Sequence, residues 1–335
     1  MSDVAIRPVG RSRRENLLER VVAAVTVVLI VVFSISIEGF ATLGNLKVIL
    51  SNAAAIAVLS CGMAVVVVTR GLDLSLVAQM VSGALTFSIL VANGTPASIA
   101  ILIAITTMAL IGMLNAWMIA YVEIPAMLAT LASAMFVTGL FRFAVLQGGF
   151  LLLLPKTDPT VAFFAGEVGP GLPVSVALMV ATLAATWFLL NATARGRVIY
   201  AMGDNFQSAR LTGLPVRTTT IVVYVFAALT ALLAGLITSS ASGAVDFRTV
   251  TNGTLLFDVI LVVVLGGIPL RGGRGGLRNI VVGLALIVVL RNGMTLIDFT
   301  TQTQDMLKGL VLIVAIVTDN YLNPRDTETD TVGDL

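Results

Sequence analysis

Long apolar stretches recur along this chain, and they limit what it can fold into more than any other feature does. A helix that crosses a bilayer needs roughly 20 mostly apolar residues, within a range of about 17–25. Ten candidate stretches occur among the 335 residues, of which the eighth and the tenth are short. They are Val21–Ile37, Lys47–Thr69, Leu74–Val91, Ser98–Ala120, Ala126–Leu146, Pro173–Leu190, Thr219–Ser240, Thr254–Gly267, Ile280–Leu296 and Met306–Asp319. The sequence therefore predicts an all-α fold, a polytopic helical membrane bundle with about ten transmembrane helices.

The composition agrees with this prediction. Apolar side chains make up 58% of the chain and charged side chains only 11%, whereas soluble domains carry about 25% charged residues. The mean hydropathy of +1.03 points the same way. These values exclude an ordinary soluble domain.

Lys and Arg are distributed unevenly between the two sides of the predicted bundle. Ten spans place both termini on the same side, and cytoplasmic segments of membrane proteins carry an excess of basic residues. With the N-terminus inside, fourteen of the 20 Lys and Arg residues fall in inner segments, and four, including Lys308, fall in outer segments. Both termini are therefore predicted to be cytoplasmic.

Three regions follow from this topology. Residues 1–20 are predicted to be a basic cytoplasmic N-terminal segment, residues 21–322 the transmembrane domain, and residues 323–335 an acidic cytoplasmic tail. The first span follows basic residues, as a secretory signal would. However, Val21–Ile37 is longer than the usual apolar core of a signal, and no convincing small-x-small cleavage site follows it. We expect it to be retained as the first helix.

Several kinds of chemistry are excluded by what the chain lacks. With no His and one Cys, it has no Cys/His zinc cluster, no His-based acid–base catalysis and no intramolecular disulfide. Cys61 lies in an apolar run and is expected to be a small buried hydrophobe. The Gly-rich stretch 266–276 lacks the Gly-Lys-Ser/Thr ending of a P-loop. The chain is thus predicted not to be an enzyme and to use no cofactor or metal, and its short basic tracts do not indicate nucleic-acid binding.

Ionisable residues at membrane depth are costly, so each one is a candidate functional residue. Asp73 lies between the second and third spans, and Asp258 lies early in the eighth. Arg142, late in the fifth span, is expected to reach the outer interface with its long stem. Arg291 lies deeper in the ninth span, and an ion pair with Asp258 would offset its desolvation. We therefore hypothesise an Arg291–Asp258 pair.

The segment TRGLDLS, residues 69–75, has the pattern of a helix break followed by a cap. Gly71 permits unusual backbone dihedrals, and Asp73 or Ser75 can accept hydrogen bonds from free N–H groups at the start of the third span. One interpretation is a short turn with a capping acid. The other is a break on a solute path, where non-helical backbone is tolerated in membrane proteins.

The longest predicted cytoplasmic loop, Asn191–Thr218, contains signals for a short helix. Asp204 or Asn205 suits the N-cap, Phe206–Thr212 fits two helical turns, and Gly213 suits the position after the helix. Four residues spaced i, i+3, i+4 and i+7 share one face; they are Phe206, Ala209, Arg210 and Gly213. A helix of this kind either docks into a groove of another protein or lies on the membrane surface.

Four motifs in this chain resemble those of ribose-type sugar permeases, the membrane subunits of bacterial ATP-binding-cassette importers. They are TRGLDLSLVAQMVSGA (69–84), Asn115 followed by IPAMLATLA (124–132), GDNFQSARLTGLPVR (203–217) and VVVLGGIPLRGGRGG (262–276). They occur in the order and spacing of that family, from about Phe40 to Leu322. Four motifs in register are much more specific than any one of them.

The resemblance implies particular roles for particular residues. The coupling helix that fits into the ATPase would comprise Gly203, Asp204, Asn205, Phe206, Ala209, Arg210, Leu211 and Gly213. The translocation pathway would include the matching residues Gly71, Asp73, Ser75 and Asp258. The uncharged spans add small, hydroxyl and amide groups to its predicted lining, namely Asn115, Thr130 and Ser133. The Gly-rich inner loop would contain Gly266, Gly267, Gly272, Gly273 and Gly275.

The resemblance also implies a location and partners. These are a bacterial inner membrane that the chain crosses many times, separate cytoplasmic ATP-binding-cassette ATPase subunits, a periplasmic solute-binding protein and a second permease chain, identical or related. The expected function is ATP-driven import of a monosaccharide or a related small polar solute, with specificity set mainly by the binding protein.

Alternatives to a sugar importer remain open. The chain has Leu256-Phe257 before Asp258 where the family usually has Glu-Leu, and Arg291 where a small or polar residue is common. A polyol, nucleoside or branched-chain amino acid is therefore an alternative solute. A secondary transporter is a further alternative, although few intramembrane carboxylates are available for ion coupling, and a membrane-embedded enzyme has little support.

Overall fold

The computed structural model describes residues 15–154, 159–169 and 171–322, and the predicted terminal segments 1–14 and 323–335 lie outside these residues. Each of the ten predicted spans coincides with a helix. These helices are α1 (Glu15–Ser36), α2 (Leu43–Val68), α3 (Leu76–Ala92), α4 (Ala97–Ala120), α5 (Ala126–Ala144), α7 (Val174–Trp187), α10 (Val216–Ser242), α12 (Thr254–Leu265), α13 (Leu277–Leu296) and α14 (Thr301–Leu322).

Within the described residues, seven helical segments are long and apolar enough to cross a membrane, by length and composition. They lie in α1, α2, α4, α5, α7 with the π-helical turn η1 (Phe188–Ala192) that extends it, α10 and α13. The apolar helices α3 and α12 are shorter, and a break in the backbone precedes each of them. The all-α membrane bundle predicted from the apolar stretches is confirmed.

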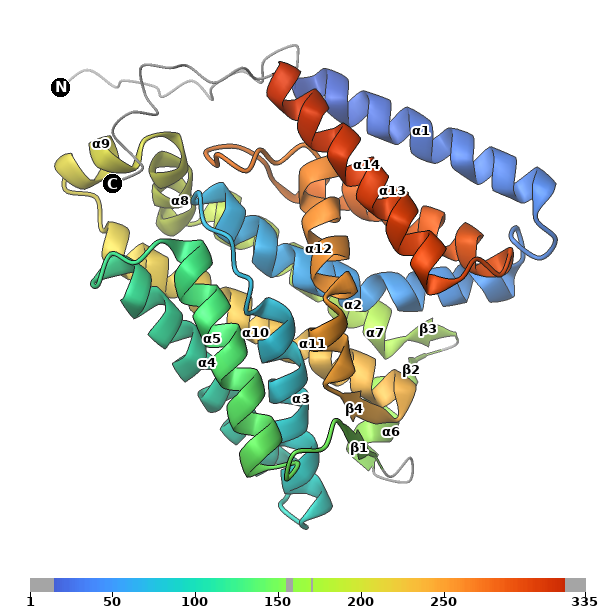
Figure 1. The fold of residues 1–335 in the computed structure, drawn as a ribbon, viewed down its shortest axis with the longest axis horizontal. Helices are drawn as coiled ribbons and strands as arrows, with labels where there is room; N and C mark the ends of the chain where they lie inside the picture. Colours follow the sequence, from blue (N-terminus) through green and yellow to red (C-terminus); the bar gives the residue numbers. More distant parts are fainter. Residues whose placement is uncertain (1–14, 155–158, 170, 323–335) are drawn as a thin grey trace.

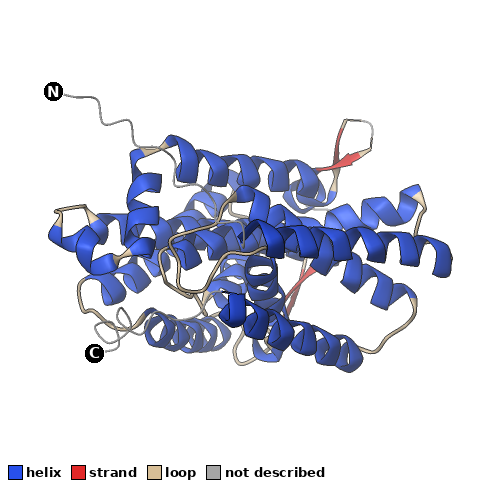
Figure 2. Cartoon of the chain, turned by 90° about the horizontal axis from the view of Figure 1, so that it is seen from above, coloured by secondary structure: helices blue, strands red, loops and turns tan. Residues whose placement is uncertain are grey.

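Short elements connect the long helices at the two ends of the bundle. They are β1 (Leu151–Leu153), α6 (Pro159–Ala165), β2 (Glu167–Val168), β3 (Leu172–Pro173), α8 (Ala194–Asp204), α9 (Phe206–Leu211), β4 (Ala244–Asp246) and α11 (Arg248–Asn252). Strand β1 pairs antiparallel with β4, and β2 with β3. Figure 2 shows how small this strand content is beside the helices.

Helices α2 and α10 occupy the centre of the bundle, and α1, α4 and α5 lie toward its outside (Figure 1). Close packing in the centre depends on small residues, as it commonly does between membrane helices. At Gly112 of α4, an added Cβ would approach the backbone of Tyr224 in α10 to within 2.7–3.1 Å. A side chain at this position would therefore force the two helices apart.

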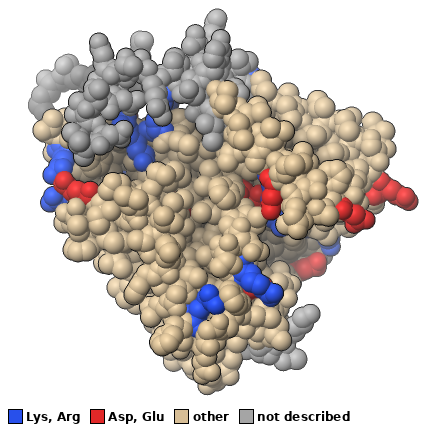
Figure 3. All heavy atoms as spheres, viewed as in Figure 1, with Lys and Arg blue, Asp and Glu red and all other residues tan. Residues whose placement is uncertain are grey.

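The outer helices expose much of their apolar surface. Large side chains along α5 are exposed, including Met135, Phe136 and Phe143. On the face drawn in Figure 3, charged side chains are sparse and broad uncharged surface separates them. Lipid tails suit such a surface, because apolar side chains gain nothing from contact with water.

The two ends of the bundle differ in the elements they carry. Helices α8 and α9 lie at one end, and the short strands with α6 and α11 lie at the other (Figure 1). In the topology predicted from the basic residues, the α8–α9 end is cytoplasmic and the strand end is external. The chain thus presents a helical inner surface and a mixed outer surface.

Candidate functional site

The break between α2 and α3 gathers most of the residues predicted for the pathway. Helix α2 ends at Val68, and Arg70 then takes a left-handed conformation, with a φ of 67°. The sequence placed this conformational freedom at Gly71, and that detail was wrong. Gly71 is needed for space instead, because an added Cβ would lie 2.8 Å from the hydroxyl of Tyr224 and 2.9 Å from Val66 Cγ1.

The Ser75 hydroxyl is the centre of a buried polar cluster in this break. It lies 2.5 Å from Asp73 Oδ1, to which it donates, and it accepts from Gln79 Nε2 at 2.7 Å and from Asn115 Nδ2 at 2.9 Å. Asp73 Oδ1 also accepts from the Ser75 amide at 2.9 Å. Asp73 thus accepts from a free amide in the turn that leads into α3, as the sequence suggested, whereas Ser75, the N-cap residue, makes no side-chain cap hydrogen bond.

Thr130 connects α5 to the same break. Its hydroxyl accepts from the Leu74 amide at 3.1 Å and lies within hydrogen-bonding distance of the Leu72 and Ala126 carbonyls, at 3.1 and 2.8 Å. Ser133 lies one turn further along α5 and is buried, with no hydrogen-bond partner for its hydroxyl among the described residues. Residues from α3, α4 and α5 therefore meet around the break.

Several polar atoms around the break have unused hydrogen-bonding capacity. Within the described chain, Gln79 Oε1, Asn115 Oδ1 and the Tyr224 hydroxyl have no partner, although all three side chains are buried. A buried polar atom without a partner costs about 1–3 kcal/mol. The sequence-based prediction missed Gln79 and Tyr224; the signal for Gln79 was an amide one helical turn after Ser75 in an apolar span.

Asp258 lies apart from this cluster and is neutralised by a residue that was not predicted to meet it. Its Oδ1 lies 2.9 Å from Nζ of Lys308 in α14, whereas its Oδ2 lies 3.8 Å from Nη1 of Arg291. The Asp258 side chain is 4% exposed, and that of Arg291 is 46% exposed. The predicted Arg291–Asp258 pair is therefore formed only at long range. Lys308, which was counted among the outer basic residues, lies in the first half of α14 with its side chain buried.

The predicted cytoplasmic loop contains two helices where one was expected. Helix α8 occupies Ala194–Asp204, so Asp204 is a last helical residue and does not cap the next helix. Asn205 is the N-cap of α9, and its side chain accepts from the Ser208 amide at 2.8 Å. Gly213 follows the helix in the left-handed conformation expected of it, with a φ of 77°.

The exposed face of α9 differs from the predicted one. Ala209 is only 4% exposed and packs with Val198, Met202 and Val216 in a small apolar cluster, so it cannot belong to a docking face. Leu211, by contrast, is 85% exposed. Ala209 packs α9 against the rest of the chain, and the α9 residues on either side of it are exposed.

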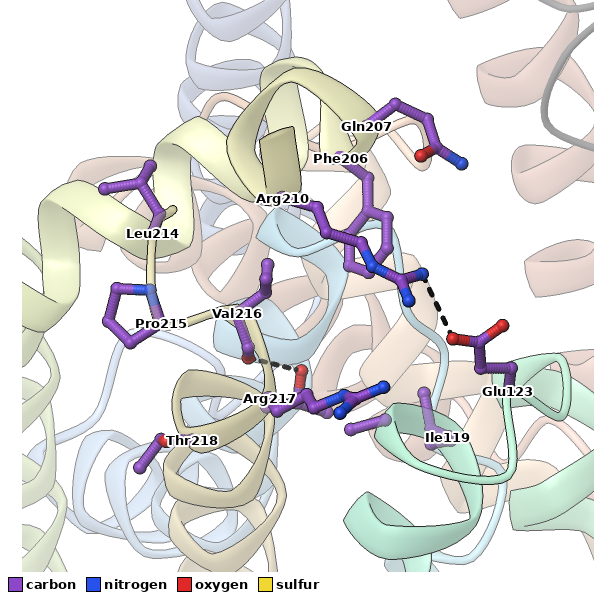
Figure 4. Close-up of a pocket in the computed structure, with 12 residues that line it drawn as sticks. Ile119, Glu123, Phe206, Gln207, Arg210, Leu214, Pro215, Val216, Arg217 and Thr218 are labelled. Atoms are coloured by element: carbon purple, nitrogen blue, oxygen red, sulfur yellow. Dashed lines mark hydrogen bonds and ion pairs between the residues drawn. The ribbon is translucent and has the colours of Figure 1, made fainter. Parts of the chain in front are cut away.

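A cavity of about 520 Å³ separates α9 from the turn between α4 and α5 (Figure 4). Phe206 and Arg210 line it from α9, and Ile119 and Glu123 line it from the other side. An ion pair crosses between the two sides, with Arg210 Nη1 3.0 Å from Glu123 Oε1. The cation predicted to serve a partner is thus engaged within this chain.

Three segments that are far apart in the sequence meet at the end of α8. Arg70 donates from Nε to the Gly203 carbonyl at 2.8 Å and from Nη2 to the Asp204 carbonyl at 2.6 Å. The Gly273 amide of the Gly-rich loop donates to the Val68 carbonyl at 2.9 Å. The break after α2, the end of α8 and the Gly-rich loop therefore form one junction.

The junction leaves no space for a side chain at its centre. An added Cβ at Gly203 would collide with the Val68 carbonyl oxygen and the Gly273 amide nitrogen. Gly273 has a φ of 77°, and its added Cβ would approach the Gly203 carbonyl oxygen to within 2.9 Å. Glycine at these two positions is what lets the three backbones come together.

Comparison with known proteins agrees with this arrangement. Residues 45–316 match the family described as "Branched-chain amino acid transport system / permease component". The ribose import permease protein of Escherichia coli (strain K12) is 31% identical over 307 residues, which cover 91% of this chain and 94% of that protein. The L-arabinose transport system permease protein of the same organism is 29% identical over 296 residues, 88% of each chain.

A probable ABC transporter permease protein of Escherichia coli (strain K12) is likewise 29% identical, over 91% of this chain and 90% of its own length. No solved structure matches. The match to the family covers well over half of the chain and includes the break after α2, α8–α9 and the Gly-rich loop. By this evidence the chain belongs to the family of transport-system permease components, and it is a multi-pass membrane permease.

Proposed function

We propose that this chain is the permease subunit of an ATP-driven importer of a monosaccharide or a closely related polar solute, in the cytoplasmic membrane of a bacterium. The observation that carries the proposal is the match of nearly the whole chain to permeases named for two different sugars, ribose and arabinose. A match over one motif would support only a shared local structure, whereas these matches cover 91% and 88% of the chain.

The chemistry of the buried cluster favours a sugar over an amino acid, although the family description names branched-chain amino acids. The groups bonded around Ser75 are a hydroxyl, two amides and one carboxylate. They contain no cation to receive the carboxylate of an amino acid, whereas hydroxyl groups can both donate to and accept from them.

The proposed pathway runs past the break between α2 and α3. Its residues are those gathered there and on the facing turn of α5, namely Gly71, Asp73, Ser75, Asn115, Thr130 and Ser133, to which we add Gln79 and Tyr224. The unused polar atoms of Gln79, Asn115 and Tyr224 support this assignment, because a passing hydroxyl-rich solute or its water could satisfy them. Asp258 was predicted for the same path, but its pairing with Lys308 favours a structural role.

The proposed contact with the ATPase is the exposed surface of α8–α9. The predicted residues Gly203, Asp204, Asn205, Phe206, Arg210, Leu211 and Gly213 remain assigned to it, and Ala209 supports it from beneath. Leu211 and Phe206 are exposed apolar side chains at the cytoplasmic end, which suits insertion into a groove of a partner.

The remaining partners follow from this role. A periplasmic binding protein would deliver the solute to the end that carries the short strands. A second permease chain, identical or related, would complete the pathway, and two ATPase subunits would drive it. Residues 21–322 form the permease domain in this proposal, residues 191–218 the coupling segment, and residues 1–20 and 323–335 cytoplasmic extensions.

Uptake by reconstituted vesicles tests the proposal. The chain, co-expressed with its proposed ATPase and binding-protein partners, is placed in proteoliposomes with internal ATP. Labelled ribose, arabinose and leucine are then offered separately. ATP-dependent uptake of a sugar that survives a protonophore is expected; uptake of leucine alone would assign an amino-acid importer. Uptake that needs no ATP and collapses with the protonophore would identify a secondary transporter.

A further inference from the structure

The junction at the end of α8 joins the surface that would contact the ATPase to the break that carries the polar cluster. We propose that Arg70 is the positioning residue of this junction, through which movement of α8–α9 reaches the α2–α3 break. This inference rests on the proposed function, because it assigns a transmission step to a chain that is driven by a partner.

The first support is the match between the donors of Arg70 and the end of a helix. The last carbonyls of a helix have no partner within the helix and carry a partial negative charge. Gly203 and Asp204 provide the last two helical carbonyls of α8, and Arg70 donates one hydrogen bond to each. The planar guanidinium holds two donors in fixed directions, so the contact fixes orientation as well as distance.

The second support is the backbone conformation of Arg70 itself. A residue with a side chain is strained in a left-handed conformation, because its Cβ comes too close to the backbone, and this conformation is uncommon outside glycine. Arg70 has a φ of 67°, and this conformation ends α2 and starts the break. The same residue that turns the chain toward Asp73 therefore also donates the two hydrogen bonds to the end of α8. Strain of this kind persists only where the surrounding contacts fix it.

The third support is the short path from Arg70 to the polar cluster. Gly71 follows Arg70 directly and packs against Tyr224, and Asp73 and Ser75 follow within five residues. The Leu72 and Leu74 backbones contact Thr130 of α5. A displacement of the Arg70 backbone must therefore disturb residues that three different helices contribute to the cluster.

Two substitutions separate this role from a general contribution to folding. Arg70→Gly removes the guanidinium and at the same time relieves the cost of the left-handed conformation, so the variant is expected to fold. Arg70→Lys keeps a cation but loses the planar pair of donors. Arg20→Gln is the matched control, because Arg20 is an exposed arginine on α1.

The measurement is the ratio of solute taken up to ATP hydrolysed, in proteoliposomes that contain the whole transporter. Arg70→Gly is expected to keep its thermal midpoint and its ATP hydrolysis but to lower the ratio at least three-fold, with Arg70→Lys between it and the unchanged protein. Arg20→Gln should leave the ratio unaltered. A ratio for Arg70→Gly equal to that of the unchanged protein overturns the proposal, as does a parallel loss of hydrolysis and thermal midpoint.

Hydrogen exchange provides a readout that does not depend on the identity of the solute. In the unchanged protein, binding of the ATPase subunits is expected to slow exchange of the amides of Gly71 and Ser75. In Arg70→Gly, it should slow exchange only in α8–α9. If protection at Gly71 and Ser75 is the same in both, the proposal is wrong even if uptake of a sugar is established. A third outcome is that the unchanged protein takes up no solute, yet ATPase binding slows exchange at Gly71 and Ser75 in it and not in Arg70→Gly. The proposed function is then wrong, whereas the role of Arg70 at the junction is supported.

Discussion

Lys308 of α14 and Asp258 of α12 form an ion pair inside the bundle, with Nζ and Oδ1 2.9 Å apart. Both side chains are almost completely buried, and Asp305 Oδ1 approaches the same ammonium group to 3.0 Å. Arg291 approaches the pair from α13 but stays half exposed. The pair thus holds the last helix of the described chain onto α12.

Breaking this pair from one side is expected to destabilise the protein strongly. Removing one partner of a buried ion pair leaves an uncompensated charge, at a cost of about 3–5 kcal/mol. Lys308→Met should therefore lower the thermal midpoint of the detergent-solubilised protein far more than Arg291→Met does. The double variant Asp258→Leu/Lys308→Met should recover most of the loss, because both charges are gone. Equal effects of Lys308→Met and Arg291→Met would show that the two cations share Asp258 equally.

The hydroxyl of Ser75, the N-cap residue of α3, should matter more than any hydroxyl within that helix. Ser75→Ala deprives Asp73 of a donor, leaves the Asn115 amide without its acceptor, and leaves the Gln79 amide with only its longer bond to Asp73 Oδ2, at 3.4 Å. Each buried polar group left without a partner costs about 1–3 kcal/mol, so we expect a lower thermal midpoint and at least a ten-fold loss of solute uptake.

Ser82→Ala is the matched control for Ser75→Ala. Ser82 lies within α3, the helix that Ser75 precedes, and is equally buried, but its hydroxyl has no hydrogen-bond partner among the described residues. Its removal should therefore not lower the thermal midpoint, and uptake should stay close to that of the unchanged protein. If the two substitutions lower uptake equally, burial of any hydroxyl on α3 matters and the hydrogen bonds of Ser75 do not.

The ion pair between Arg210 and Glu123 is expected to act on coupling and not on stability. Both side chains are about half exposed, and exposed pairs contribute only about 0–1 kcal/mol. Glu123→Gln should thus leave the thermal midpoint within a degree or two. It frees Arg210 for an acidic group of the ATPase, so we expect ATPase binding, measured by titration in detergent, to become tighter by a small factor. Weaker binding would show that the pair of Arg210 with Glu123 is needed to hold α9 in the orientation that binds the ATPase.

The spans were predictable because their signal is local. A membrane-length apolar helix satisfies its own backbone hydrogen bonds, so its position follows from a single continuous stretch of sequence. Confirmation therefore extended even to the short span that became α12. Helix α8 was missed because it lacks such a continuous apolar stretch. It is amphipathic, partly polar and shorter than a span, so its sequence resembles that of a loop.

The candidate site was predictable in part. Asp73 and Ser75 were expected together because they are two residues apart, and Asn115 and Thr130 were expected as amide and hydroxyl groups of uncharged spans. Side-chain contacts between helices that are distant in the sequence could not be predicted, because they depend on how the helices pack. Lys308 was assigned to an outer segment, yet it reaches Asp258, 50 positions earlier in the chain, because α14 lies against α12. Arg70 was counted only as an inner basic residue, since nothing local indicates its contact with α8.

Leu211 should be the side chain of α9 on which ATPase binding depends most. It is 85% exposed at the end predicted to be cytoplasmic, and an apolar side chain so exposed gains free energy when a partner groove covers it. Leu211→Asp is expected to fold normally, because the residue contributes little to the packing of this chain, and to weaken ATPase binding at least ten-fold in a pull-down titration. Leu43→Asp is the control, since Leu43 is 82% exposed but lies at the opposite, external end of α2. Undiminished binding by Leu211→Asp would place the ATPase contact elsewhere on α8–α9 and leave Leu211 facing lipid headgroups.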